Sequence, residues 1–292
     1  MKGECHGHII LDGYNSRHSL SMHKGQPNSN IIMERLKIYK DMGITFFRDG
    51  GDNLGVSLLA AKMAPAYGID YRTPAYAICK FGSYGGFLSR SFSNISEYRN
   101  LVLQVLELGG DFIKIMASGI LDFSQYGVVT HKAITEQELN DMINFAHSLG
   151  LAVMTHVNGA ENVKAAITAG TDSVEHGFYI NDECLSLMAK KKTIWVPTVT
   201  PIVNLIGKGL YPDSVLKRIA VEQLENVKKA LEIGCIIAVG SDAGAHNVFH
   251  GKGITQEIRY LTPCFKSKNQ MYEVLSEGER IISQRFKSPK LH

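Results

Sequence analysis

The sequence has few cysteines, no long apolar run and no signal-like segment at its start. Its five cysteines are scattered over 292 residues, are odd in number and never occur as Cys-x-x-Cys. This usage is typical of reduced thiols, so we expect a cytoplasmic protein without a disulfide framework. No uninterrupted apolar stretch approaches the roughly 20 residues of a membrane-spanning helix, and the first residues, MKGECHGH, lack the apolar core of a signal peptide. We therefore predict neither a membrane span nor export.

An excess of charge of one sign is also absent. The 31 Lys and Arg residues against 28 Asp and Glu give a formal net charge of +3, and the basic residues are spread along the chain. The sequence therefore indicates no nucleic-acid partner, and we expect a small-molecule ligand; a homo-oligomer is left open. No linker or internal repeat divides the chain, so we predict one domain over residues 1–292.

What the sequence does contain is an alternation of short apolar runs with longer segments of helical periodicity, which is typical of β/α units on a parallel sheet. Eight runs rich in Ile, Val, Phe and Tyr are predicted strands, at 4–10, 44–50, 71–79, 112–118, 151–156, 172–177, 193–199 and 236–242. Helical patterns fill the intervals, at 31–42, 54–67, 95–108, 136–149, 159–169, 181–191 and 213–233, with two more after residue 253.

Helix boundaries are marked by two kinds of residue. Thr135 and Glu138 have the spacing of a capping box at a helix N-terminus. Glycines that permit a left-handed C-cap follow other helices, at Gly43, Gly68, Gly150, Gly170 and Gly234. Eight β/α units in roughly 250 residues match a closed (β/α)8 TIM barrel better than an open sheet.

In such a barrel the active site lies at the carboxyl ends of the strands, so polar residues there are candidates for chemistry. His6 and His8 are two residues apart on the first predicted strand, and the period of 2 sends both side chains to the same side. They are either ligands of one metal ion or two solvated histidines of a half-exposed strand.

Lys114 lies in the run FIKIMAS and shares a strand face with Phe112 and Met116. If this face is inside the barrel, the ammonium group loses its hydration and needs a partner. The alternatives are an outward face, on which the lysine stem reaches water, and carboxylation of the amine by CO2 to an anionic carbamate that can bridge two metals.

Three further polar residues stand at predicted strand ends. His156 and His176 end neighbouring strands 20 residues apart, the length of one compact β/α unit. Asp242 ends the eighth strand, where it either caps the next helix or binds metal and moves a proton. Six further histidines without an identifiable partner are interpreted as surface or structural residues, His18, His23, His131, His147, His246 and His292.

In this order the six candidate side chains make the chain resemble the amidohydrolase superfamily. The stretches GITFFRDGG, DFIKIMASG, THVNG to SVEHG, and VGSDAG followed by His250-Gly are similar to the imidazolonepropionase and metal-dependent prolidase branch. The resemblance runs from about residue 3 to about residue 260. It implies a TIM barrel, here without the small β-sandwich domain of relatives, and a helical tail from about residue 264.

The resemblance also implies a metal centre. His6, His8 and Asp242 would hold one divalent ion, His156 and His176 a second, and carboxylated Lys114 would bridge them. Zinc is the first expectation, with manganese, iron or cobalt as alternatives. A hydroxide held between the ions would attack the carbonyl of a substrate amide, and catalytic Asp242 would pass the proton to the departing amine.

Lys114 distinguishes branches within the superfamily. Deaminase-like members resemble a one-metal design without this lysine, so a dipeptide or N-acyl amino acid amidohydrolase fits better than a deaminase. Lactone or ester hydrolysis on the same ligand set is the alternative. A degenerate metal-binding barrel without activity, or a piece of a larger enzyme, is also left open.

Residues in contact with a substrate are harder to derive. Predicted loops near the barrel mouth offer Tyr84, Arg90, Tyr126 and Tyr211 as candidates for a substrate carboxylate. Phe87 stands where relatives often have a histidine after paired glycines, so substrate contacts of relatives are not transferred to this loop.

Overall fold

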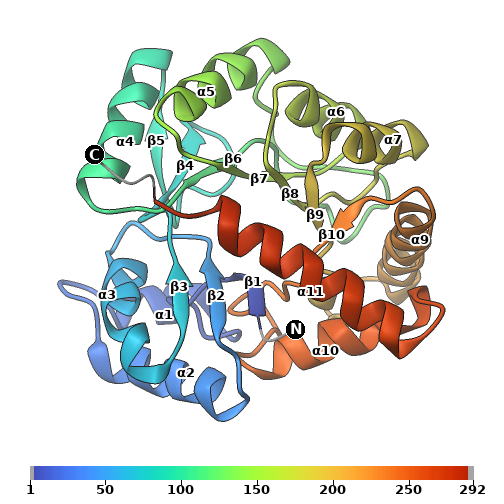
Figure 1. Ribbon diagram of the computed structural model, residues 1–292, viewed down its shortest axis with the longest axis horizontal. Coiled ribbons are helices and arrows are strands. Elements are labelled where there is room, and N and C mark those ends of the chain that lie inside the picture. The colour runs from blue at the N-terminus through green and yellow to red at the C-terminus, as the bar shows by residue number, and fades with distance from the viewer. Residues whose placement is uncertain (1–2, 289–292) are drawn as a thin grey trace.

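The computed structural model describes residues 3–288, in which short parallel strands alternate with helices (Figure 1). The strands are β1 (Gly3–Gly7), β2 (Phe46–Asp49), β3 (Asp70–Arg72), β4 (Ala77–Lys80), β5 (Ser89–Phe92), β6 (Ile113–Met116), β7 (Val153–Val157), β8 (Ser173–His176), β9 (Ile194–Val196) and β10 (Ile236–Ile237). The α-helices are α1 (Ser16–Ser21), α2 (Ser29–Asp41), α3 (Val56–Met63), α4 (Ile95–Glu107), α5 (Glu136–Ser148), α6 (Ala160–Thr168), α7 (Asp182–Lys191), α8 (Thr200–Val203), α9 (Asp213–Glu232), α10 (Lys252–Leu261) and α11 (Lys268–Arg285), with 3-10 turns η1 (Ala64–Tyr67) and η2 (Thr262–Cys264).

The strands form two parallel ladders, β1-β2-β3 and β10-β9-β8-β7-β6-β4-β5. Backbone hydrogen bonds join these ladders into a closed barrel. On one side the Cys5 amide donates to the Val239 carbonyl at 3.0 Å, and the Asp242 amide donates to the His6 carbonyl at 2.8 Å. On the other side the Asp111 amide donates to the Thr73 carbonyl at 2.7 Å. The prediction of a (β/α)8 barrel is confirmed.

The third predicted strand, 71–79, is divided into two. β3 pairs with β2, whereas β4 pairs with β6 and with the unpredicted strand β5. Pro74 lies between the two pieces and has no backbone N–H to donate to a neighbouring strand. The break at Pro74 separates β3, which belongs to the β1-β2-β3 ladder, from β4, which belongs to the second ladder.

Helix boundaries follow the sequence closely. The capping box of Thr135 and Glu138 is present at the start of α5. All five glycines predicted to follow helices have positive φ angles between 71° and 98°. The short helices α1 and α8 were not predicted, because neither is long enough to display an apolar periodicity.

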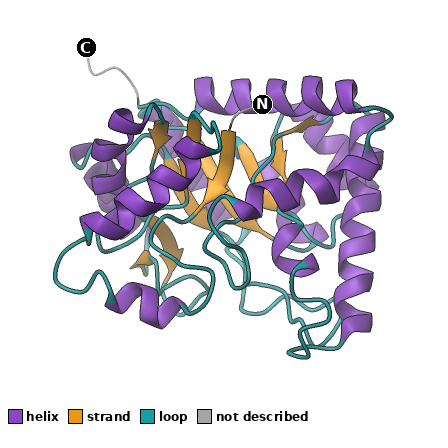
Figure 2. Cartoon of the chain, turned by 90° about the horizontal axis from the view of Figure 1, so that it is seen from below, coloured by secondary structure: helices purple, strands orange, loops and turns teal. Residues whose placement is uncertain are grey.

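Helix α11 covers the amino-terminal end of the barrel. It crosses in front of the strands in Figure 1, and the long loops gather at the opposite end in the side view of Figure 2. Ile282 and Phe286 pack with Cys5 and Phe112 in the apolar layer at this end. Gly278 brings the helix against β10, since a Cβ there would lie 2.0 Å from the Ile237 oxygen. The predicted helical tail thus closes the barrel opposite the mouth.

No helix among the described residues combines the length and apolarity needed to cross a membrane.

Candidate metal centre and substrate cavity

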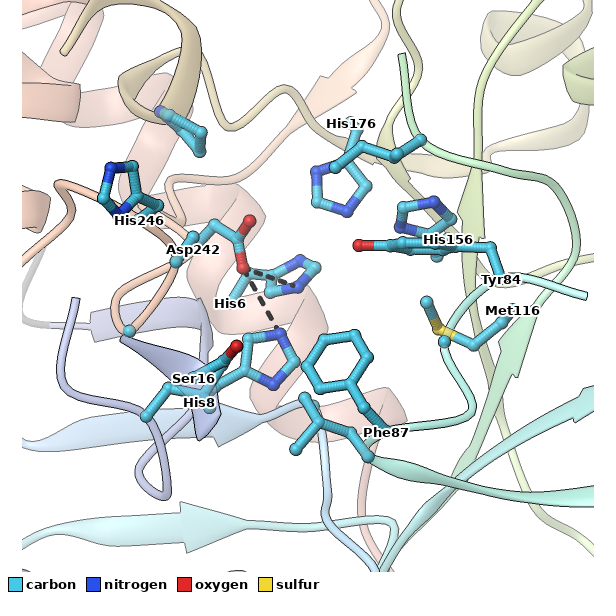
Figure 3. Close-up of a pocket in the computed structure, with 18 of the residues that line it drawn as sticks. His6, His8, Ser16, Tyr84, Phe87, Met116, His156, His176, Asp242 and His246 are labelled. Atoms are coloured by element: carbon cyan, nitrogen blue, oxygen red, sulfur yellow. Dashed lines mark ion pairs between the residues drawn. The ribbon is translucent and has the colours of Figure 1, made fainter. Parts of the chain in front are cut away.

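The six residues singled out from the sequence line one cavity of about 580 Å³ at the carboxyl ends of the strands. They come from β1 and the residue after it (His6, His8), β6 (Lys114), β7 (His156), the end of β8 (His176) and the segment after β10 (Asp242). Segments up to 236 residues apart in sequence therefore converge at one point, as Figure 3 shows.

Two groups of side chains face each other in this cavity. Asp242 Oδ1 lies 3.3 Å from His8 Nε2 and 3.6 Å from His6 Nε2, and ligand atoms of these three residues all lie within 4.8 Å of one another. The rings of His156 and His176 are 4.6 Å apart between centroids, and the His176 ring is 5.0 Å from that of His6. This spacing suits two adjacent cations sharing one set of ligands.

Each inner histidine is held through one ring nitrogen by a protein group. The ionised Glu175 carboxylate accepts from His6 Nδ1 at 2.6 Å, and the Gly119 carbonyl accepts from His156 Nε2 at 3.2 Å, so the proton of each imidazole lies on that nitrogen. His176 Nδ1 is 2.6 Å from Thr198 Oγ1. The remaining nitrogen of each ring is free to bind a metal, the arrangement typical of metal-binding histidines.

The electrostatics keep these groups in ligand form. Burial lowers the pKa of His6 to about 4 and that of His156 to about 3, with the positive charge of Lys114 adding to the effect. Burial opposes the charge of Asp242, but the hydrogen bond from His8 and the electrostatic effect of the surrounding histidines hold the pKa of this carboxyl well below its usual range. At neutral pH His6 and His156 are therefore neutral imidazoles, and Asp242 is an anionic carboxylate.

Lys114 faces the cavity rather than the outer wall. Its side chain is 1% exposed, and within residues 3–288 its Nζ has no hydrogen-bond partner. Burial, with a smaller contribution from the charge of Arg48, lowers the pKa of Lys114 to about 8 against the opposing charge of Glu175. A buried amine without a partner is costly, and His6 Nε2 likewise has no hydrogen-bond partner within residues 3–288. Both orphaned atoms fit a site that holds divalent cations.

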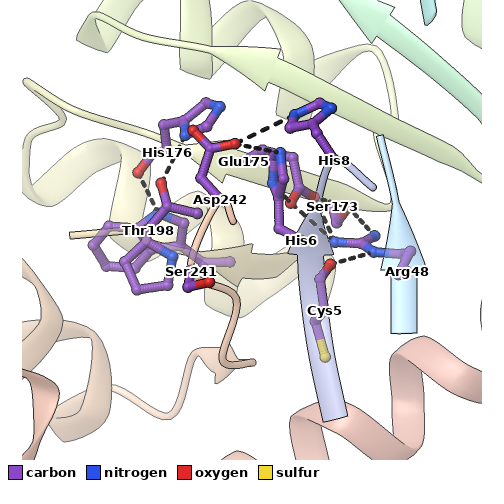
Figure 4. A network of polar contacts seen from close by, with 12 residues as sticks. Cys5, His6, His8, Arg48, Ser173, Glu175, His176, Thr198, Ser241 and Asp242 are labelled. Atoms are coloured by element: carbon purple, nitrogen blue, oxygen red, sulfur yellow. Dashed lines mark hydrogen bonds and ion pairs between the residues drawn. The ribbon is translucent and has the colours of Figure 1, made fainter. Parts of the chain in front are cut away.

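A fully buried polar network lies beneath the two groups (Figure 4). Arg48 of β2 donates through Nη2 to both Glu175 oxygens at 2.8 and 2.9 Å and through Nε to the Cys5 carbonyl at 2.7 Å. Its guanidinium also stacks on the ring of Phe286, 4.4 Å from the centroid. Burial alone would raise the pKa of Glu175, but Arg48 and His6 bring it down to about 2. The network connects the closed end of the barrel to the first histidine of the site.

Sequence reasoning missed this network. Arg48 lies in the stretch GITFFRDGG and Glu175 in SVEHG. From the sequence, Arg48 is a charged residue before a turn, and Glu175 is only the neighbour of His176. The sequence did contain a signal for this ion pair: each residue is a charged residue inside a predicted strand, and a buried charge needs a partner of opposite sign.

A second support holds His176. Glu257 of α10 accepts hydrogen bonds from the Val199 amide at 2.9 Å, the Thr200 amide at 2.7 Å and the Thr200 hydroxyl at 2.6 Å. These bonds fix the segment that carries Thr198, whose hydroxyl contacts the His176 ring. Burial raises the pKa of Glu257 to about 7.

Of the four predicted substrate contacts, Tyr84 lines the cavity, with its ring 5.1 Å from that of His156. The structure places the other three elsewhere among the described residues. Arg90 donates to Gln104 and lies over the ring of Tyr76, Tyr126 donates to Glu222, and Tyr211 packs on Phe123. Arg17 and His246, neither of which was proposed from the sequence as a site residue, lie at the cavity instead, whereas His292 lies outside the described residues.

Comparisons with known proteins agree with this geometry. Residues 42–277 match the model of the amidohydrolase family. Ochratoxinase from Aspergillus niger is 28% identical over 207 residues, which make up 66% of this chain and 42% of that protein, so the chain spans less than half the length of this curated relative. A solved Xaa-Pro dipeptidase structure with bound methionine aligns with a TM-score of 0.74 at 22% identity, over 96% of this chain and 74% of the other.

A solved structure from Bifidobacterium longum, described as that of a prolidase, aligns with a TM-score of 0.77 at 18% identity, over 97% of this chain and 69% of the other. These two likenesses establish the shared barrel architecture. The family match covers most of the chain and includes four of the six converging side chains, Lys114, His156, His176 and Asp242. The chain belongs to the amidohydrolase family.

Proposed function

We propose that this protein is a metal-dependent amidohydrolase that cleaves the amide C–N bond of a dipeptide or an N-acyl amino acid. The observation that carries the proposal is the buried amine of Lys114, which has no hydrogen-bond partner within residues 3–288 and lines the same cavity as the two groups of potential metal ligands. The names of the relatives, an ochratoxinase and an Xaa-Pro dipeptidase, support the same class of reaction.

His6, His8 and Asp242 would hold one divalent ion, and His156 and His176 a second, with zinc the first choice for these ligands. Lys114, carboxylated by CO2, would contribute an anionic oxygen to both. The lowered pKa of Lys114 favours this modification, because only the neutral amine adds to CO2. When bound, the ions activate a water molecule and polarise the substrate carbonyl.

The remaining chemistry belongs to the chain itself. Asp242 stays ionised, lies 3.3 Å from His8 Nε2 through its Oδ1, and is suited to accept the proton of the attacking water and return it to the leaving amine. Burial, together with the charge of Asp242, raises the pKa of Tyr84. The Tyr84 hydroxyl, which points into the cavity in Figure 3, therefore remains a hydrogen-bond donor for an oxygen of the substrate.

The test is metal analysis combined with a substrate panel. We expect close to two ions per chain after reconstitution with zinc and bicarbonate, and hydrolysis of N-acyl amino acids or dipeptides. Preferential cleavage of lactones or esters would replace the amide assignment. Full metal occupancy without turnover of any member would contradict the proposed reaction and favour a metal-binding barrel.

A further inference from the structure

The charges that line the cavity are strongly one-sided. Among the described lining residues, Asp242 is the one carboxylate, and it lies among the imidazoles of the candidate metal centre. The guanidinium of Arg17 lies at the cavity, and the metal ions would add further positive charge. A positively charged substrate group near the reacting carbonyl would therefore find repulsion and no acidic partner.

The walls of the cavity differ in character. The segments after β6, β8 and β9 contribute a continuous apolar surface from five residues, Leu121, Phe123, Phe178, Ile202 and Leu205. Helix α1, which follows β1, contributes Arg17. Within the described part of the chain, Arg17 has no ion pair or hydrogen bond through its side chain, so its charge is available to a ligand.

We infer, building on the proposed function, that the substrate is an N-acyl amino acid with a bulky apolar acyl group rather than a dipeptide with a free amino terminus. In a dipeptide the α-ammonium is two bonds from the scissile carbonyl, which places it beside the metal centre and against the apolar wall. An acyl chain at the same place buries apolar surface and needs no counter-charge. The carboxylate of the departing amino acid faces Arg17.

A matched pair of substrates tests the acyl side. L-leucyl-L-phenylalanine and 4-methylpentanoyl-L-phenylalanine differ only in the ammonium group, and both would be assayed with the zinc-reconstituted enzyme at neutral pH. We expect kcat/KM for the acyl compound to be higher by at least about tenfold, since one uncompensated charge is worth more than one decade. Equal or better cleavage of the dipeptide would overturn the inference while leaving the amidohydrolase assignment intact.

The pH dependence of the ratio of the two kcat/KM values gives a second readout. Titration of groups in the protein changes kcat/KM for both substrates and therefore cancels in the ratio. The terminal amine of the dipeptide, in contrast, loses its proton near pH 8. The preference should therefore shrink above about pH 8. If neither compound is cleaved, the proposed function fails, and competition binding still decides the inference: tighter binding of the acyl compound supports it, and equal binding overturns it.

The leaving-group side is tested with Arg17→Gln. For 4-methylpentanoyl-L-phenylalanine we expect KM to rise about three- to tenfold with kcat nearly unchanged. This is the effect expected when an exposed ion pair between Arg17 and the substrate carboxylate is lost. The 4-methylpentanoyl amide of phenethylamine lacks the carboxylate, so its KM should not change. Lys24→Gln removes an exposed charge outside the cavity lining and should leave both KM values as they are. An unchanged KM in Arg17→Gln, or equal losses for both substrates, would contradict the role of Arg17.

Discussion

Replacing Glu175 with glutamine should weaken metal binding and destabilise the fold at the same time. Glu175 accepts a hydrogen bond from His6 Nδ1 and two from Arg48, and all three side chains are fully buried. Glutamine has nearly the same shape but carries no charge, and its amide nitrogen cannot accept a hydrogen bond from either partner. The substitution leaves the Arg48 guanidinium buried without a counter-ion.

The size of both effects follows from these contacts. Removal of one partner of a buried ion pair costs about 3–5 kcal/mol, because the other charge stays behind without compensation. Loss of the group that orients a metal-binding histidine lowers metal affinity by about 10- to 100-fold, or roughly 1.4–2.7 kcal/mol. The metal-free protein should show the first loss, and metal titration should show the second.

Two measurements separate the effects. Denaturant unfolding of the metal-free protein gives the stability change, and competition with a chelator gives the metal dissociation constant under conditions in which the variant is folded. The control is Glu183→Gln, which breaks the exposed pair with Lys164 and should change stability by less than about 1 kcal/mol without affecting metal affinity.

A double variant sharpens the test. Arg48→Met combined with Glu175→Met replaces the ion pair with apolar groups and should recover much of the lost stability, since such replacements are often neutral. His6 would still lack its acceptor, so metal binding should remain weak. Wild-type metal affinity in both Glu175 variants would refute the reasoning that this carboxylate positions His6.

The remaining predictions concern the site, its support and the closed end of the barrel. Lys114→Ala should lower kcat/KM by at least about 100-fold and abolish uptake of isotope-labelled bicarbonate seen by NMR, while retained uptake would place the carbamate elsewhere. Asp242→Asn should lower kcat by about 10²- to 10⁴-fold, the usual range for a proton-transferring group, and a smaller loss in a fully metal-loaded variant would exclude that role. Because burial raises the pKa of Glu257 from 4.5 to about 7, its contribution to stability is present below pH 4.5 and is lost as pH rises through about 7, by roughly 3 kcal/mol. The difference in unfolding free energy between wild type and Glu257→Gln should therefore vary over that pH range, and a constant difference would contradict the raised pKa. Gly278→Ala should cost about 1–3 kcal/mol or more through the clash with the Ile237 oxygen, whereas Gly86→Ala, with open space around the added Cβ, should be nearly neutral in thermal unfolding.

Most of the barrel could be predicted because its pattern is local. Apolar runs, capping residues such as Thr135 and C-terminal glycines each act within a few residues, and the structure follows them closely. The division of the third strand at Pro74 and the addition of β5 could not be predicted in the same way. They depend on which strand lies next to which, and that is a property of the closed barrel.

The substrate-contact candidates illustrate the same limit on loops. Tyr126 was chosen for its place in a loop near the mouth, but it donates to Glu222 and lies under Arg218, which hold it against helix α9. Arg90 finds Gln104 and the ring of Tyr76. The direction of Tyr126 depends on a distant helix and that of Arg90 on the unpredicted strand β5, so neither could be derived from the neighbouring sequence, whereas the six candidate ligands at the predicted strands reach one cavity.

Even strand alternation fails where the strands end, and the failure explains how the site is built. In a regular strand, Glu175 and His176 would point to opposite faces. His176 instead has a φ of 67°, and Asp242 a φ of 60°, both in the left-handed region that non-glycine residues rarely adopt. The change of backbone direction after Glu175 lets its carboxylate stay inside the barrel with Arg48 while His176 turns into the cavity above it. Strained conformations persist only where surrounding contacts hold them, and here the Trp195 indole and the Gln223 amide both donate to the His176 carbonyl, at 3.0 and 2.6 Å. The strain at these strand ends is therefore the physical means by which adjacent residues serve two different layers, one supporting the site and one forming it.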